Sequence, residues 1–186
     1  MMTTSTKVDR REFLKAGASG CSALILGFYL PMRGQTQNPA PAAGAPFKAN
    51  AWISITPDDQ ITLLTEIPEM GQGTRTADAV MLADELEADW ATIRVEQAPT
   101  IPDVYKHLGT GGSGGTAGTW MPMRQAGAQA RAMLLAAAAT QWNVPPSECQ
   151  ASNGSVIHTP TGRRFRYGEL VATAAALPPV KPSRRR

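Results

Sequence analysis

The sequence predicts an α+β domain of two layers, a sheet with helices packed on it, between about Phe47 and Pro179. Two runs within residues 51–66 alternate apolar and polar side chains with a period of two, which is typical of strands. Two later stretches instead repeat apolar residues at helical spacing. The first of these lies between two strand-like runs, and this order favours a helix that packs against a sheet.

The first half of the domain is expected to form a hairpin, a helix and a third strand. Residues 51–55 and 60–66 are the paired strands, and the turn between them contains Pro57. The helix is expected over about residues 74–90, and the third strand over residues 92–97. The buried helix stripe is Ala79, Leu82, Ala83 and Leu86, and the solvated face is Asp84, Glu85 and Glu87.

The second half begins with a long loop over residues 98–119, and long loops in compact domains are often functional. An alanine-rich helix follows, with Pro122 in its first turn and a stop at residues 143–146. Arg124 and Arg131 are predicted to be surface or salt-bridge residues, and Arg124 is the better functional candidate of the two. The expected core residues of this helix are Trp120, Ala126, Ala130, Met133, Leu134 and Ala137.

The C-terminal part is expected to hold one short strand and a last helix. Turn signals at residues 153–154 and 161–162 flank the predicted strand 156–158. The last helix is expected over residues 167–176. A basic tail follows at residues 180–186, where the chain is expected to be truncated.

A glycine pair lies between the second strand and the first helix, in the stretch EMGQGTRT at residues 69–76. Gly71 and Gly73 carry no Cβ, so a ligand can approach the backbone closely. The unpaired N–H groups at the start of a helix favour an anion, most often a phosphate. The other interpretation is a tight turn whose glycines serve steric needs only, because isolated glycine motifs are weak signals.

A second glycine run precedes the second helix, over residues 109–119, and supplies several hydroxyl groups among its glycines. The run joins two ordered segments, which favours a binding loop over a flexible linker. Two anion-binding loops in one small domain predict a ligand with two phosphates, or with one phosphate and other polar groups.

The stretches EMGQGTRT and GTGGS, with WMPMRQAGAQARAMLLAAA after them, resemble the molybdopterin-binding subunit of the xanthine dehydrogenase family. The resemblance is to the exported branch typified by the isoquinoline 1-oxidoreductase beta subunit and related aldehyde dehydrogenases. It extends from about Arg10 to Pro179. It implies that the domain binds molybdopterin with molybdenum, in the cytosine dinucleotide form that is usual in this branch.

The resemblance also implies which residues contact the cofactor. The first cradle would comprise Gly71, Gln72, Gly73 and Thr74, and the second would comprise Gly112, Ser113 and Thr116. Gln72 would bond to the pterin or to its phosphate, and the glycines would allow backbone approach. Some relatives carry a hydroxyl group at the position of Gly115, so one contact is expected to be missing here.

No catalytic residue and no protein metal ligand is assigned. In the family the catalytic glutamate lies in a far C-terminal segment, and the dithiolene of the pterin, not the protein, binds the metal. Glu69 is predicted to be a strand-end residue and not a substitute for that glutamate. His107 and His158 are isolated in the sequence, so each is predicted to be a surface loop or hairpin residue.

The implied function is the N-terminal cofactor-binding part of a molybdenum hydroxylase that acts on aldehydes or N-heterocycles, with water as the oxygen source. Electrons would leave through 2Fe–2S clusters on a small partner subunit, and a cytochrome c is a further candidate acceptor. Family members are several times longer than these 186 residues, so the chain is expected to be a fragment or a truncated product and inactive alone. A non-catalytic remnant and a generic phosphate- or nucleotide-binding module remain alternatives.

Residues 1–45 are predicted to be an export leader with a Pro/Ala linker, followed by the folded domain at residues 46–179. Arg10 and Arg11 fit the twin-arginine pattern. The apolar stretch 16–30 is shorter than the roughly twenty residues that span a bilayer, and suits a signal peptide. A membrane anchor after a chance arginine pair is the alternative. The leader predicts export by the twin-arginine machinery to the periplasm or the periplasmic face of the inner membrane.

The charge distribution argues against a nucleic-acid partner. The net charge of +3 divides into +3 in residues 1–45, +4 in residues 181–186 and −4 in residues 46–180. The ends therefore produce the high isoelectric point, and the core is acidic. Of the two cysteines, Cys21 lies in the leader and Cys149 in the body, so the mature domain cannot contain an internal disulfide framework.

Overall fold

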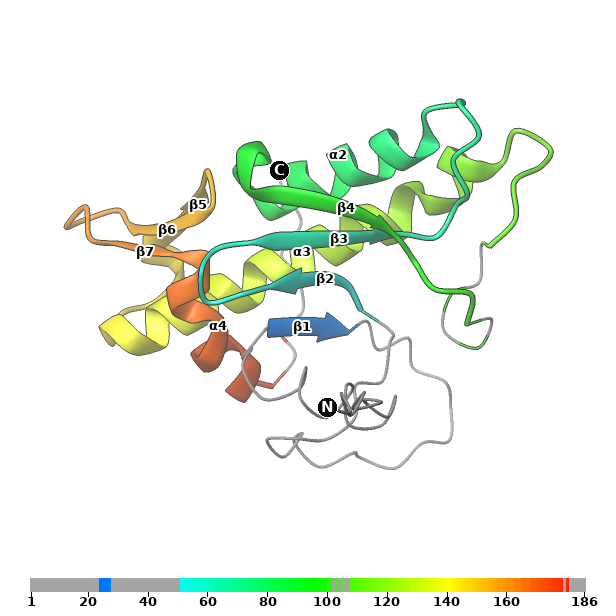
Figure 1. Cartoon of the computed structure of the whole chain (residues 1–186). Helices are drawn as coiled ribbons and strands as arrows, with labels where there is room; N and C mark the ends of the chain where they lie inside the picture. The colour runs from blue at the N-terminus through cyan, green and yellow to red at the C-terminus, as the bar shows by residue number, and fades with distance from the viewer. Residues whose placement is uncertain are drawn as a thin grey trace, which may run out of the picture.

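The computed structural model describes residues 24–27 and 51–180, except residues 102, 104, 106, 107 and 179 (Figure 1). His107, the remainder of the predicted leader and the end of the basic tail lie outside the described residues. In chain order the elements are β1 (Leu24–Gly27), β2 (Ala51–Ile55), β3 (Ile61–Thr65), α2 (Thr74–Leu86), η1 (Trp90–Thr92), β4 (Ile93–Gln97), α3 (Gly115–Trp142), η2 (Pro146–Glu148), β5 (Cys149–Ser152), β6 (Ser155–His158), β7 (Arg164–Arg166) and α4 (Tyr167–Ala176).

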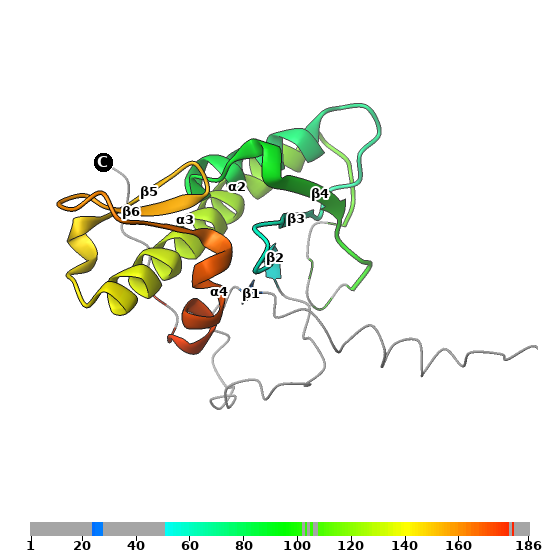
Figure 2. The same ribbon diagram turned by 60° about the vertical axis from the view of Figure 1, so that its left-hand side comes forward.

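A four-stranded sheet with the order β1-β2-β3-β4 forms one layer. β2 and β3 are the predicted antiparallel hairpin, with Ile53 opposite Leu63. β3 and β4 run parallel, and the helix between them is the crossover that a parallel pair requires. α2 and α3 lie on one face of this sheet (Figures 1 and 2). The predicted hairpin, helix and third strand are therefore confirmed.

The edge strand β1 is a feature that the sequence did not predict. It lies within the apolar stretch 16–30 of the predicted signal, and it pairs antiparallel with β2. Leu24 is opposite Ile55 in this pairing, and the register shifts after Leu26. The backbone of residues 24–27 thus extends the sheet on the side away from β4.

Helix α2 begins at Thr74 as predicted but ends at Leu86, four residues earlier than expected. It ends there because Glu87 adopts a left-handed conformation with φ of 56° and closes the helix on the carbonyls of residues 83 and 84. The predicted stripe is confirmed, since Ala79, Leu82, Ala83 and Leu86 are all buried. The prediction that Glu85 faces solvent is wrong, because its side chain is buried and paired with two arginines of α3.

Helix α3 runs for 28 residues and begins five residues earlier than expected, inside the glycine run. Pro122 is therefore in the second turn, not the first. The five predicted alanine, methionine and leucine core positions of α3 are all buried. The prediction for Trp120 is wrong, because this side chain is 48% exposed. The guanidinium of Arg124 lies 5.5 Å from the centre of the Trp120 ring. Arg124 and Arg131 are salt-bridge residues, as predicted, and both pair with Glu85.

The two helices cross closely at Gly127. A Cβ at this position would lie 2.6 Å from the carbonyl oxygen of Leu82 and 2.8 Å from the Cβ of Glu85. Real Cβ atoms do not approach that closely, so glycine is needed where α3 passes over α2. This close crossing packs the middle of α3 against the C-terminal end of α2.

A second, three-stranded antiparallel sheet of order β5-β6-β7 packs near the C-terminal half of α3. The sequence predicted only its middle strand, so the two-layer description was incomplete. His158 lies in the hairpin as predicted, but it is not at the surface: it is 4% exposed, with Nε2 2.9 Å from Glu148 and Nδ1 2.7 Å from Thr161. α4 has the predicted bounds.

Within the described residues, no helix combines the length and apolar character that would let it cross a membrane.

Candidate functional site

The two glycine loops, which are far apart in the sequence, meet at one end of the domain. The Thr110 hydroxyl donates a hydrogen bond of 3.1 Å to the carbonyl oxygen of Pro68. At Gly115, a Cβ would be 3.4 Å from side-chain atoms of both Ile67 and Thr74, so the start of α3 packs against the start of α2. Both views show the loops at the same end of the sheet (Figures 1 and 2).

In the first loop, the backbone amides that were predicted to receive an external anion surround the carboxylate of Glu69. Its Oε1 accepts hydrogen bonds from the N–H of Gly71 at 2.8 Å and of Gly73 at 3.0 Å, and its Oε2 accepts one from Arg75 at 3.1 Å. The bonds from Gly73 and then Arg75 hold the pKa of Glu69 below its ordinary value of 4.5. Glu69 is not a strand-end residue, because β3 ends at Thr65.

Gln72 lies across the same loop. Its Nε2 donates to the carbonyl oxygen of Pro68 at 2.8 Å, and its Oε1 accepts from the N–H of Met70 at 2.6 Å. Both polar ends of the side chain therefore bond to the loop backbone, while the residue as a whole stays exposed. Gly71 and Gly73 have φ of 98° and 79°, which only glycine adopts without strain, so they shape this turn as well.

The second loop presents backbone groups at the start of α3. Gly112 and Ser113 both have left-handed conformations, with φ of 58° and 54°, and both are exposed. Among the hydrogen bonds of the described residues, none joins a side chain to the first amides of α3. This helix start can therefore receive an anion through its N–H groups, with the Ser113 hydroxyl beside them and Thr116 half-buried in the first turn.

Gly109 and Gly111 indicate room for a ligand at the second loop. Neither has a positive φ, and a Cβ at either position would meet no atom within 4 Å. Neither backbone conformation nor internal packing therefore requires glycine at these positions. A side chain there would cover the loop backbone, and its absence leaves that backbone accessible to a bulky polar ligand, which fits a pterin dinucleotide.

A buried polar bond joins the two helix starts beneath the loops. The Thr119 hydroxyl donates a 2.6 Å bond to Oδ1 of Asp78, and both residues are buried. Thr74 is also buried, so its side chain faces Gly115 and not solvent. Asp78 was not predicted from the sequence, although it lies four residues before the core residue Leu82 on the same helix face.

A second buried acid anchors the base of the first loop. Glu66 is 2% exposed, and Nε1 of Trp52 donates to its Oε1 at 2.7 Å. Burial, followed by the charge of Glu66, raises the pKa of the Tyr105 hydroxyl, which places that ring in the same cluster. Gln97 bonds to the carbonyl oxygens of Thr65 and Glu66 at 3.0 Å. The end of β3 is thus held in place before the glycine pair begins.

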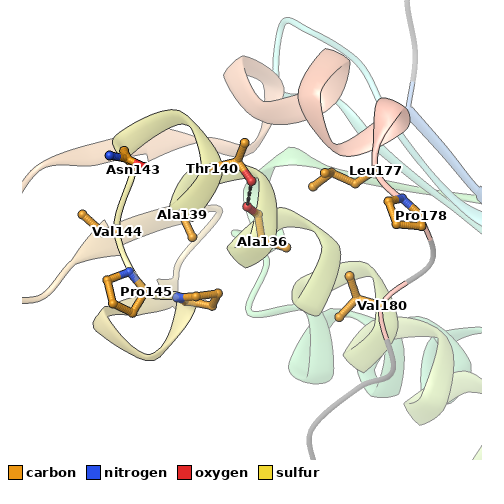
Figure 3. Close-up of a pocket in the computed structure, with 10 residues that line it drawn as sticks. Ala136, Ala139, Thr140, Asn143, Val144, Pro145, Leu177, Pro178 and Val180 are labelled. Atoms are coloured by element: carbon orange, nitrogen blue, oxygen red, sulfur yellow. Dashed lines mark hydrogen bonds between the residues drawn. The ribbon is translucent and has the colours of Figure 1, made fainter.

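A surface groove of about 620 Å³ lies at the other end of α3 (Figure 3). Ala136, Thr140 and Asn143 line one side, and Leu177, Pro178 and Val180 line another. More than 20 residues of helix separate Gly115 from this groove, which corresponds to roughly 30 Å at 1.5 Å per residue. The groove is therefore separate from the glycine loops.

In the described part of the chain, no three His, Cys, Asp or Glu side chains are grouped so that they could hold a metal ion.

Comparison with known proteins gives matches over almost the whole chain. Residues 6–184 match the family model for the molybdopterin cofactor-binding domain. The isoquinoline 1-oxidoreductase subunit beta of Brevundimonas diminuta is 35% identical over 176 residues, which cover 91% of this chain and 22% of that protein. The membrane-bound aldehyde dehydrogenase (pyrroloquinoline-quinone) of Gluconacetobacter polyoxogenes is 34% identical over 169 residues, covering 89% of this chain and 21% of that protein.

Solved structures share the fold. Quinoline 2-oxidoreductase from Pseudomonas putida 86 matches 68% of this chain and 16% of its own, with a TM-score of 0.53 and 21% identity. The Cu,Mo-CO dehydrogenase in its carbon monoxide reduced state matches 63% of this chain and 15% of its own, with a TM-score of 0.51 and 24% identity. The chain thus spans only 22% or less of the length of each of these relatives. The family match and the paired glycine loops agree, and the chain belongs to the molybdopterin cofactor-binding domain family.

Proposed function

We propose that the two glycine loops bind a molybdopterin dinucleotide and that the chain is the cofactor-binding part of a molybdenum hydroxylase. The observation that carries this proposal is the uncovered backbone of Gly109 and Gly111, beside a start of α3 that no described side chain caps. That helix start lies directly against the first loop through Gly115 and Thr74. A ligand that bridges both loops would therefore meet amides, hydroxyl groups and open glycine backbone within one region.

The residues of the two loops would divide the binding between them. Backbone amides near Gly112 and the start of α3 would receive phosphate oxygens, and the hydroxyl groups of Ser113 and Thr116 would bond beside them. Gly71 and Gly73 would let the cofactor approach the backbone, and Gln72 would exchange one of its loop bonds for a bond to the cofactor. When bound, the cofactor supplies the two-electron oxidation of the substrate with an oxygen atom from water.

The whole enzyme would act on aldehydes or N-heterocycles and pass electrons to 2Fe–2S clusters on a small partner subunit, with a cytochrome c as a further acceptor. The names of the isoquinoline and aldehyde oxidoreductases support this substrate class. The name of the aldehyde dehydrogenase includes pyrroloquinoline quinone, so this quinone is the alternative cofactor. A measurement of bound cofactor has to distinguish it from molybdopterin. Arg10 and Arg11 support export by the twin-arginine machinery to the periplasm.

The test is to measure the cofactor content of the protein purified from molybdate-supplied cells, as wild type and as Gly111→Ala. Wild type should contain molybdenum, oxidisable pterin and releasable CMP in equal amounts. Gly111→Ala should lose most of this cofactor while its melting temperature stays that of cofactor-free wild type, since the added methyl group meets no protein atom. Gln150→Ala, an exposed position in β5, is the control and should retain the cofactor.

Each alternative function predicts a different cofactor content. A remnant without binding function would contain neither metal nor pterin, and a generic nucleotide-binding module would release a nucleotide without molybdenum. Quinone without molybdenum would support the second cofactor. Full cofactor content in Gly111→Ala would show that the open backbone of the second loop is not the binding surface.

A further inference from the structure

We infer that Glu69 is a built-in anion that closes the first glycine loop to phosphate and so assigns the phosphates of a bound cofactor to the second loop. The consequence for the cofactor rests on the proposed function, whereas the hydrogen bonds of Glu69 do not depend on it. The carboxylate accepts three backbone N–H bonds of 3.1 Å or less, from Gly71, Gly73 and Arg75. These are the same donors that a phosphate would need at this loop.

The two loops differ in whether a side chain of the protein already bonds to their amides, and this decides whether an external anion can bind there. At the first loop, a carboxylate of the chain itself already bonds to the amides of Gly73 and Arg75 at the start of α2. At the second loop, no described side chain bonds to the first amides of α3. An external phosphate at the first loop would have to break three charge-assisted hydrogen bonds or remain a few ångströms from Glu69 as a like charge. At the second loop it would meet free donors.

The side chain of Gln72 supports the same division. It bonds to Pro68 and Met70 and lies across the loop that Glu69 closes, so it offers an exchangeable neutral amide and no positive charge. With its amides neutralised internally, the first loop is suited to an uncharged hydrogen-bonding ring system. Glu69 is therefore a positioning residue: it acts through the loop backbone and has no assigned contact with a reacting atom.

The test uses the 186-residue chain labelled with ¹⁵N and inorganic pyrophosphate as the probe, read by the amide resonances of both loops. In wild type at neutral pH, pyrophosphate should shift the amides of residues 112–117 and leave those of Gly71, Gly73 and Arg75 in place. In Glu69→Gln, which keeps the side-chain shape and removes the charge, pyrophosphate should also shift the first-loop amides, with apparent affinity there raised about tenfold or more. Asp58→Asn removes an exposed carboxylate from the turn at the other end of β3 and should behave as wild type.

A pH titration without pyrophosphate gives an independent readout. The amide protons of Gly73 and Arg75 should titrate together, with a midpoint below 4.5, and this titration should vanish in Glu69→Gln. First-loop amides that shift with pyrophosphate in wild type as strongly as in Glu69→Gln would overturn the inference. So would amides that do not titrate with Glu69. Neither readout involves molybdenum or pterin. Failure of this inference can therefore be distinguished from failure of the proposed function, in which the protein would carry no cofactor.

Discussion

The ion pairs of the buried Glu85, near the end of α2, allow a quantitative test of what holds α2 and α3 together. Glu85 is 5% exposed and lies against the guanidinium groups of Arg124 and Arg131, with 3.8 Å between its Oε2 and an Nη of Arg131. Arg131 is itself 8% exposed. Replacing Glu85 by alanine would leave this arginine buried beside a space that the carboxylate had filled.

The expected cost follows from the distance. Two unit charges 3.8 Å apart attract by about 4 kcal/mol at an effective dielectric constant of about 20. Removing one partner of a buried pair typically costs about 3–5 kcal/mol, because the other charge remains desolvated. Glu85→Ala should therefore lower the free energy of unfolding by about 3–5 kcal/mol, which is a large part of the roughly 5–15 kcal/mol of a typical domain.

The assay is urea-induced unfolding of the purified chain, followed by far-UV circular dichroism. Arg166→Ala is the matched control, because Arg166 also pairs with an acid, Asp59, at 2.9 Å but is 64% exposed; it should cost less than about 1 kcal/mol. The double variant Glu85→Leu with Arg131→Leu should be more stable than Glu85→Ala, since it removes both buried charges. A loss below about 1 kcal/mol for Glu85→Ala would refute the buried-pair reasoning.

Three further predictions concern the helix crossing, the first loop and the leader. Gly127→Ala should cost about 1–3 kcal/mol in the same unfolding assay, because its methyl group would lie 2.6 Å from the carbonyl oxygen of Leu82; an unchanged midpoint would contradict the close crossing. The contribution of Glu69 to stability should be complete above pH 4.5 and lost as the pH falls through its lowered pKa; unfolding midpoints of wild type and Glu69→Gln should therefore converge in acid. We propose that the chain is exported through Arg10 and Arg11, so replacing both by lysine should leave it in the cytoplasm on fractionation, and unchanged periplasmic delivery would count against this.

Local sequence determined most of the elements. The strands β2 and β3 were predictable from the alternation in residues 51–55 and 61–65, and α2 from the stripe of Ala79, Leu82 and Leu86. Each segment buries one face, and the spacing of its apolar residues shows which face that is. The bounds of α4 were also predictable. The predicted start of α3 was wrong because glycines within residues 115–118 suggested a loop, whereas their place in the helix depends on packing against Thr74.

The pairing partners of polar residues could not be predicted from the sequence. Acids on a helix usually face water, which predicts an exposed Glu85, but α3 brings Arg124 and Arg131 to it across the Gly127 crossing. Trp120 was predicted to lie in the core, and the structure leaves it half-exposed. Burial of a charged or aromatic side chain depends on which element covers it, and local periodicity does not contain that information.

For the candidate site, the sequence determined which residues could bind an anion, and the tertiary structure decided how they are arranged. Glycines and hydroxyl groups before two helices predicted two binding loops. Only the fold brings Pro68 within 3.1 Å of the Thr110 hydroxyl, 42 residues along the chain, and only the folded loop turns the Glu69 carboxylate onto its own amides. The physical reason is that helix-start amides are fixed by local sequence, whereas the group that satisfies them is chosen by three-dimensional proximity.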